Sequence, residues 1–209
     1  MTLSSDIYRK IMDLLLSGEL LPGQNINRRQ IASDFDVSVA PVLEAMVRLE
    51  HEGLLETIPR KGSQVRLIRE EDVLGQFILR DALESKAARI YYGDILKEKM
   101  NGLEPFARLV DQAPSDQLED WRTEIIFHRE LVSLAGIPAL TEAFDRTMKL
   151  NLFYAMARII PVHLASERDN HVDLLKRLVE APHADRAEEI IRSHVWYGKE
   201  SILKENITV

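Results

Sequence analysis

The fold of the N-terminal part is decided by residues 27–62, which read NRRQIASDFDVSVAPVLEAMVRLEHEGLLETIPRKG. Apolar residues recur at helical spacing on either side of Asp36-Val37-Ser38, which predicts two short helices joined by a tight turn. Asn27 and Gln30 have the spacing of a capping box at the start of the first helix. Ser38 is in the right position to cap the second helix.

The segments on both sides complete a winged helix-turn-helix. An amphipathic helix is expected over 5–17, before a turn rich in glycine and proline. Two short β-like runs at 54–59 and 63–68 are joined by Arg60-Lys61-Gly62, which predicts a hairpin. We therefore expect residues 1–68 to form three helices followed by a β-hairpin wing, the layout of a DNA-binding domain.

The rest of the chain, residues 69–209, is expected to be all-helical. Its amphipathic segments are separated by glycine or proline, and none of them shows strand-like alternation. Stacked amphipathic helices with short turns form a bundle, so the chain as a whole is predicted to be mostly α. The expected helices cover roughly 71–92, 94–112, 115–135, 139–158, 168–181 and 185–204.

The composition limits the possible classes of function. The 209 residues include no cysteine, which excludes disulfides, thiolate zinc sites and cysteine nucleophiles and fits a reducing cytoplasm. Because the sequence has no secretory signal and no apolar run long enough to span a bilayer, we expect a cytoplasmic protein with no membrane partner. The net charge is −7, and residues 1–68 hold eight Lys and Arg against nine Asp and Glu. Any affinity for DNA must therefore come from the local placement of cations.

Four residues of the C-terminal part have the spacing of a metal site. Glu124 and His128 are four residues apart in one expected helix, so they project from the same face. His171 and His194 are equally distant from the break at Pro182, so an antiparallel pair of helices would bring them to the same height. One carboxylate and three imidazoles suit zinc best, with nickel, iron or manganese as alternatives. The alternative to a metal site is a cluster of histidines that have only a structural role in the core. Such a structural role is expected for His51, His163 and His183.

Residues 5–66 also contain a long series of residues whose order and spacing are characteristic of one protein family. The series runs Leu16-Ser-Gly-Glu-Leu-Leu-Pro-Gly23, Ile31-Ala32, and Val37-Ser38-x-x-Pro41-Val42-x-Glu44-Ala45-Met46-x-Arg48-Leu49-Glu50-x-Glu52-Gly53-Leu54. It resembles the signature of the GntR family of transcriptional regulators. The resemblance implies that the helix from Ser38 enters a major groove while the wing contacts the backbone or minor groove. By position, the candidate DNA contacts are Arg29, Ser38, Val39, Arg48, Arg60 and Lys61.

Some of these positions have other interpretations. Each cation could be an ordinary solvated residue, and Arg48 could pair with Glu44 or Glu52 in its own helix. Family members usually carry arginine at two positions of the recognition segment where this chain has Val39 and Leu43. Arginine bound to guanine is the commonest specific base contact. Either the operator is unusual, for example one read through thymine methyl groups, or DNA binding is weak.

Looser motifs follow in residues 69–209, namely Leu79-Arg80-x-x-Leu83-Glu84-x-x-Ala87-Ala88, Glu124-Ile-Ile-Phe127-His128, Ile137-Pro138-Ala139-Leu140, His171 and His194. They resemble the FCD effector-binding domain of FadR-type GntR regulators, whose members usually have Asp in place of Glu124. A small carboxylate effector could complete the coordination of the metal while Arg80 holds its other end. Asn151 and Arg158 are further candidates for this effector site. The alternative for Arg80 is an ion pair with Glu84.

These patterns predict a DNA-binding transcriptional regulator, a repressor that binds double-stranded operator DNA as a homodimer. Its operator affinity is expected to depend on an organic or sugar acid bound in the metal-containing helical pocket. One alternative is a metal-responsive regulator, in which the ion itself is the signal. Another is a metal-dependent enzyme, but no HExxH or similar catalytic signature is present. We therefore expect no enzymatic activity.

Overall fold

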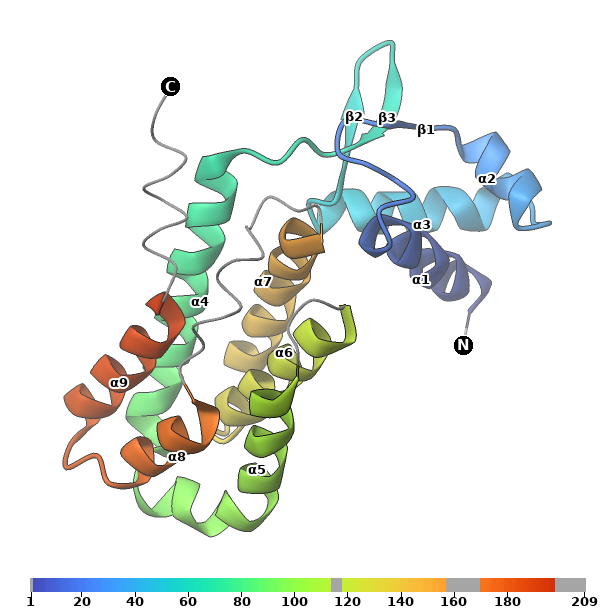
Figure 1. Cartoon of the computed structure of the whole chain (residues 1–209). Helices are drawn as coiled ribbons and strands as arrows, with labels where there is room; N and C mark the ends of the chain where they lie inside the picture. The colour runs from blue at the N-terminus through green and yellow to red at the C-terminus, as the bar shows by residue number, and fades with distance from the viewer. Residues whose placement is uncertain (1, 114–117, 157–169, 198–209) are drawn as a thin grey trace. The chain divides into compact units, whose positions relative to one another are not determined.

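The computed structural model describes residues 2–113, 118–156 and 170–197, and its helices and strands are labelled in Figure 1. The chain divides into two compact units. The first is built mainly from Met1–Arg69, and the second mainly from Glu70–Asn151 and the later helices. No described helix is both long and apolar enough to cross a membrane.

The first unit contains the helices α1 (Leu3–Leu16), α2 (Arg28–Asp34) and α3 (Val39–His51). Their order confirms the three helices expected from the sequence. The start of α1 is capped by Thr2, whose side chain accepts a hydrogen bond from the backbone N–H of Ser5. α1 and α3 pack together through apolar faces, whose fully buried side chains include Ile7, Ile11, Leu15, Val42 and Leu49.

A three-stranded antiparallel sheet completes the first unit. Its strands β1 (Asn25–Ile26), β2 (Leu55–Ile58) and β3 (Gly62–Val65) lie in the order β1-β3-β2. β2 and β3 form the predicted wing, and the turn between them holds Arg60 at a φ of 68°. β1 is not predicted by the sequence, because two residues are too few to show alternation.

Two of the expected caps are only partly correct. Asn27 accepts hydrogen bonds from the backbone N–H groups of Arg29 (2.9 Å) and Gln30 (3.4 Å), as expected. The reciprocal half of the capping box is wrong, since the Gln30 side chain donates to the Asp34 carboxylate at 2.7 Å. A carboxylate one turn ahead is the stronger acceptor. Ser38 does stand at the N-cap of α3, but its side chain makes no capping hydrogen bond.

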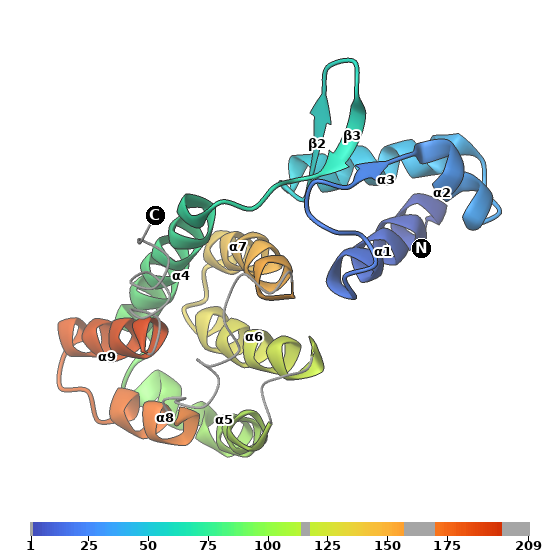
Figure 2. The same cartoon turned by 45° about the horizontal axis from the view of Figure 1, so that its top comes forward.

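Among its described residues the second unit contains helices joined by turns and no strand, which confirms the expected helical bundle. Figure 2 turns the structure so that α8 is seen between α9 and α5. Parts of four expected helices, those over 115–135, 139–158, 168–181 and 185–204, lie outside the described residues. The helices are α4 (Glu70–Tyr91), α5 (Asp94–Gln112), α6 (Leu118–Ser133), α7 (Pro138–Met156), α8 (His171–Val179) and α9 (Ala184–Trp196).

Polar contacts fix α9 on α4. Asp81 of α4 accepts hydrogen bonds from Trp196 Nε1 at 3.0 Å and from Ser85 Oγ at 2.7 Å. The same carboxylate lies 3.4 Å from Nε of Arg192. The surrounding core is apolar, and its largest fully buried side chains include Tyr91, Leu96, Phe127, Leu131, Phe144 and Leu174. The packing thus holds α4 and α9, which carry several of the candidate site residues, in a fixed relation.

Candidate functional site

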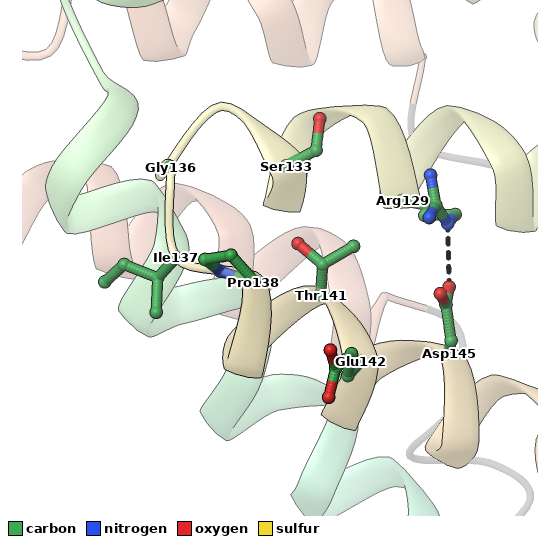
Figure 3. A pocket seen from close by; sticks show the side chains of 8 residues that line it. All are labelled: Arg129, Ser133, Gly136, Ile137, Pro138, Thr141, Glu142 and Asp145. Atoms are coloured by element: carbon green, nitrogen blue, oxygen red, sulfur yellow. Dashed lines mark hydrogen bonds and ion pairs between the residues drawn. The ribbon is translucent and has the colours of Figure 1, made fainter.

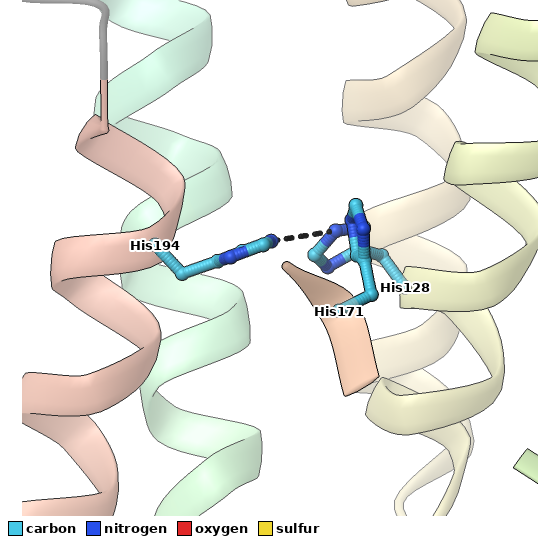
Figure 4. Close-up of side chains that lie close together, drawn as sticks. All are labelled: His128, His171 and His194. Carbon is cyan, nitrogen blue, oxygen red and sulfur yellow. Dashed lines mark hydrogen bonds between the residues drawn. The ribbon is translucent and has the colours of Figure 1, made fainter. Parts of the chain in front are cut away.

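Three histidines from three helices meet in the interior of the second unit. His128 lies in α6, His171 is the first residue of α8, and His194 lies near the end of α9. Their candidate ligand atoms all lie within 4.8 Å of one another, and all three residues are buried. Figure 4 shows the three rings gathered together, with Nε2 of His194 3.3 Å from Nε2 of His128. The fold therefore brings together three of the four predicted metal ligands.

Two of the imidazoles have a carboxylate behind them. Nδ1 of His128 lies 2.6 Å from Oε2 of Glu84, and Nδ1 of His171 lies 2.7 Å from Oδ1 of Asp111. An ionised carboxylate can only accept, so each Nδ1 carries the proton and each neutral ring keeps its lone pair on Nε2. Metal-binding histidines are usually oriented by a carboxylate or carbonyl in this way. Among the described residues, Nε2 of His171 is buried without a hydrogen-bond partner, so the donor set fits a metal ion.

The electrostatics of the site favour neutral rings. Burial lowers the pKa of both His128 and His171, and this effect exceeds the opposite effect of the nearby carboxylates. His194 lowers the pKa of His171 further. Burial by itself would raise the pKa of Glu84, but the charge of Arg80 and the contact with His128 hold that pKa well below its ordinary range. Neutral imidazole is the form that binds a metal.

Arg80 is buried and faces two carboxylates. Its Nε donates to Oε1 of Glu84 at 2.5 Å, and its Nη2 lies 3.8 Å from Oε1 of Glu124. The structure therefore contains the Arg80–Glu84 ion pair, which the sequence offered as the alternative to an effector-binding role of Arg80. Burial alone would lower the pKa of Arg80, but the two carboxylates raise it. Glu124, the fourth predicted metal ligand, is not in the close group of histidine ligand atoms, and its carboxylate forms an ion pair with this guanidinium.

The other effector candidates give less information. Asn151 is buried in α7, and its Nδ2 donates to a backbone carbonyl one turn earlier at 3.2 Å. Arg158 lies outside the described residues, as does His163. His183 has the structural role expected of it, since it caps α9 by accepting from the backbone N–H of Arg186 at 3.2 Å.

Sequence reasoning missed two carboxylates of the site. Glu84 is predicted only as a partner of Arg80, yet it also holds His128, which is 44 residues away. Asp111 precedes His171 by 60 residues and also accepts from the backbone N–H of His171 at 2.8 Å. No local spacing reveals contacts of such separation. The only signal is the general one that a ligating imidazole needs an acceptor on its other nitrogen.

A surface hollow of about 400 Å³ lies at the turn between α6 and α7. Figure 3 shows it beside Gly136 and Pro138, with the ion pair between Arg129 and Asp145 (2.8 Å) joining the two helices. None of the residues predicted to bind DNA, metal or effector lines this hollow. We assign it no role.

The predicted DNA contacts belong to the first unit and differ in their surroundings. The guanidinium of Arg48 stacks 3.9 Å from the centre of the Tyr8 ring, and its Nε lies 3.3 Å from Glu52. These contacts favour the intramolecular alternative for Arg48. The other candidates are exposed, namely Arg29, Ser38, Val39, Arg60 and Lys61.

Models of two known families match separate parts of the chain. Residues 3–65 match the model of the bacterial regulatory proteins of the gntR family, and residues 77–196 match the FCD domain. The chain therefore belongs to the GntR family and carries an FCD domain. This confirms the resemblance seen in the sequence.

Several relatives have been named as regulators. The "Probable D-xylose utilization operon transcriptional repressor" of Paenarthrobacter nicotinovorans is 28% identical over 197 residues, which cover 93% of this chain and 86% of that protein. The HTH-type transcriptional repressor GlaR of Escherichia coli is 22% identical, with 93% and 94% covered. YdhC of Bacillus subtilis, an HTH-type transcriptional regulator, is 32% identical over 61% of this chain and 58% of its own length. The match with YdhC thus spans little more than half of that protein. These names agree with the expectation of a regulator rather than an enzyme.

Solved structures support the fold. A GntR regulator from Rhodococcus sp. RHA1 superimposes with a TM-score of 0.71 at 20% identity, covering 96% of this chain and 97% of that one. McbR/YncC of E. coli gives a TM-score of 0.63 at 18% identity, covering 98% and 99%. At these identities the likeness concerns the fold alone.

Proposed function

We propose that this protein is a transcriptional repressor whose affinity for operator DNA is controlled by a small carboxylate effector bound beside a metal ion. It binds DNA as a homodimer and acts in the cytoplasm. The observation that carries the proposal is the buried group of three imidazoles, in which His171 Nε2 has no hydrogen-bond partner among the described residues.

The metal would be held by His128, His171 and His194, with Glu124 as the fourth ligand. Some FCD domains bind a metal. Three imidazoles and one carboxylate suit Zn²⁺ first, and Ni²⁺, Fe²⁺ or Mn²⁺ as alternatives. Such an ion supplies a positive charge to which an effector carboxylate can bind. Glu84 and Asp111 fix the tautomers of two of the ligands and so keep their Nε2 atoms available.

Arg80 would bind the effector. Its guanidinium already faces Glu124 at 3.8 Å, while its Nε is engaged by Glu84. An organic or sugar acid has a carboxylate of the same kind, so it competes with Glu124 for the Nη atoms of Arg80. We therefore propose that effector binding and the position of Glu124 are linked. Asn151 and Arg158 remain candidates for contacts with the rest of the effector.

DNA binding would use the first unit. Arg29 lies on α2, and Arg60 and Lys61 lie at the tip of the wing, all three exposed. These are the positions from which a winged helix-turn-helix contacts phosphates, and they supply positive charge locally although the unit is close to neutral.

The metal can be tested by thermal unfolding of the full chain with and without Zn²⁺. Occupancy at a hundred times the dissociation constant stabilises the folded state by about 2.7 kcal/mol, which raises Tm. His171→Ala and His194→Ala should each abolish this rise. His183→Ala is the matched control, because it removes the cap of α9 and lowers the basal Tm but should keep the rise. If elemental analysis finds no metal in the purified protein and added Zn²⁺, Ni²⁺ or Mn²⁺ leaves Tm unchanged, the group is a cluster of core histidines.

A second candidate function is a metal-responsive regulator. It is favoured by the three imidazoles, which by themselves supply three ligand atoms for an ion. Operator binding titrated with metal alone and then with metal and organic acids separates the two functions. In the first proposal the acid changes the affinity, whereas in the second the metal alone does.

A further inference from the structure

The exposed side of α3 carries an apolar stripe. Val39, Leu43 and Val47 are 37%, 44% and 43% exposed, although the opposite side of the same helix is buried in the core of the first unit. Their spacing of four residues places them in one row along the helix, with about 6 Å of rise between neighbours. Three solvated aliphatic side chains in one row are costly unless a partner covers them.

The polar groups beside this stripe are few. From Val39 to Val47 the only charged residue of α3 is Glu44, which is exposed, and the hydroxyl of Ser38 precedes the helix. The first cation of the helix is Arg48, whose guanidinium stacks on Tyr8 and pairs with Glu52. The first two turns of α3 therefore offer no arginine or lysine for guanine and no asparagine or glutamine for adenine.

The partner with the best-matched chemistry is the thymine edge of a major groove. Thymine presents its C5-methyl group there, and apolar side chains recognise it by direct contact. A rise of about 6 Å between stripe residues corresponds to nearly two base-pair steps of about 3.4 Å. DNA is favoured over a protein partner by the exposed cations Arg60 and Lys61 at the wing tip of the same unit.

We infer that α3 selects its operator half-site through thymine methyl groups, which contact Val39 and Leu43 first and Val47 less closely. Glu44 adds a preference for cytosine, whose N4 amino group can donate to its carboxylate. Guanine has no side-chain donor to meet it in these turns, so it is not recognised directly. This inference rests on the proposed DNA binding, and it assigns most of the sequence selectivity to side chains that carry no hydrogen-bonding group.

The experiment is a selection of the full-length protein on a random-site duplex library. The enriched site is then resynthesised with deoxyuridine in place of single thymines, which removes one methyl group and keeps the base pair. Each contacted methyl should contribute about fourfold in Kd, the equivalent of roughly 0.8 kcal/mol for one buried methylene-sized group. Leu43→Ala should remove the deoxyuridine effect at one position of each half-site. Because Leu43 is exposed, this variant should fold normally. Deoxyuridine at a flanking thymine is the control.

The possible results are distinct. Thymines enriched about two base pairs apart, with Kd sensitive to their methyl groups, support the inference. A site in which no thymine is enriched, or one whose Kd ignores every thymine methyl, overturns the inference while DNA binding stands. If folded protein enriches no site at all, the proposed DNA recognition fails and this inference fails with it.

Discussion

The carboxylate of Glu84 should be the most consequential polar group of the second unit. It is almost completely buried and joins Arg80 at 2.5 Å to His128 at 2.6 Å. Glu84→Gln keeps the shape and an acceptor but removes the charge. Removing one partner of a buried ion pair costs about 3–5 kcal/mol, and we expect the lower end because Glu124 remains 3.8 Å from Arg80. For a unit of this size, about 3 kcal/mol corresponds to a decrease in Tm of about 10 °C.

Denaturant unfolding followed by tryptophan fluorescence measures this effect in the right unit, since both tryptophans, Trp121 and Trp196, belong to the second unit. Asp145→Asn is the control. It breaks the exposed pair with Arg129, which should cost less than about 1 kcal/mol. Arg80→Met combined with Glu84→Gln should cost less than Glu84→Gln alone, because the interior then no longer holds a guanidinium that Glu124, at 3.8 Å, compensates only in part. A cost below about 1 kcal/mol for Glu84→Gln would refute this account of the buried pair.

Three further predictions concern metal and DNA. The rise in Tm with Zn²⁺ should persist at pH 6.5 and disappear at lower pH. Burial lowers the pKa of His128 and His171 below the ordinary value, so protons compete with the metal for these two rings only at lower pH; disappearance of the rise between pH 8 and 7 would contradict this. Arg60→Gln with Lys61→Gln should weaken binding to all DNA sequences. The slope of log K against log salt should fall in magnitude by about 0.9 for each phosphate that the wing no longer neutralises, and an unchanged slope would exclude the wing from the interface. Val39→Arg with Leu43→Arg should shift the selected sites toward guanine, because each bidentate contact of an arginine with guanine contributes roughly 1–3 kcal/mol. If the variant selects the same sites as the native protein, α3 docks differently.

The fold could be read from the sequence because its signals are local. The glycine, proline and capping positions around residues 17–62 mark where the helices and the wing begin and end, and the described elements follow them closely. β1 escaped prediction because its pairing with β3 is made across about 40 residues, with no pattern of its own. The predicted capping role of the Gln30 side chain was wrong for a local reason, since this side chain donates its hydrogen bond to Asp34 instead.

The candidate site was predictable only in part. The relation of His171 and His194 to the turn at Pro182 indicates convergence, and the fold brings both rings to His128. The carboxylates behind the rings belong to contacts between helices distant in sequence, so no spacing could reveal them. Glu124 shows a different limit of the sequence. Its spacing from His128 predicts that both side chains project from one face of the helix, but it does not predict whether the carboxylate turns to the metal site or to Arg80.

The three imidazoles come from segments far apart along a chain that contains no cysteine, and His194 follows His128 by 66 positions. An ion shared by these two rings would close a long loop of the polypeptide, as a disulfide does in other proteins. Holding such a loop closed removes chain entropy equivalent to about 4 kcal/mol from the opened states. Detachment of α9 would then require the ion to give up a ligand. The availability of metal, rather than the redox state of the cell, would set how often this end of the domain opens.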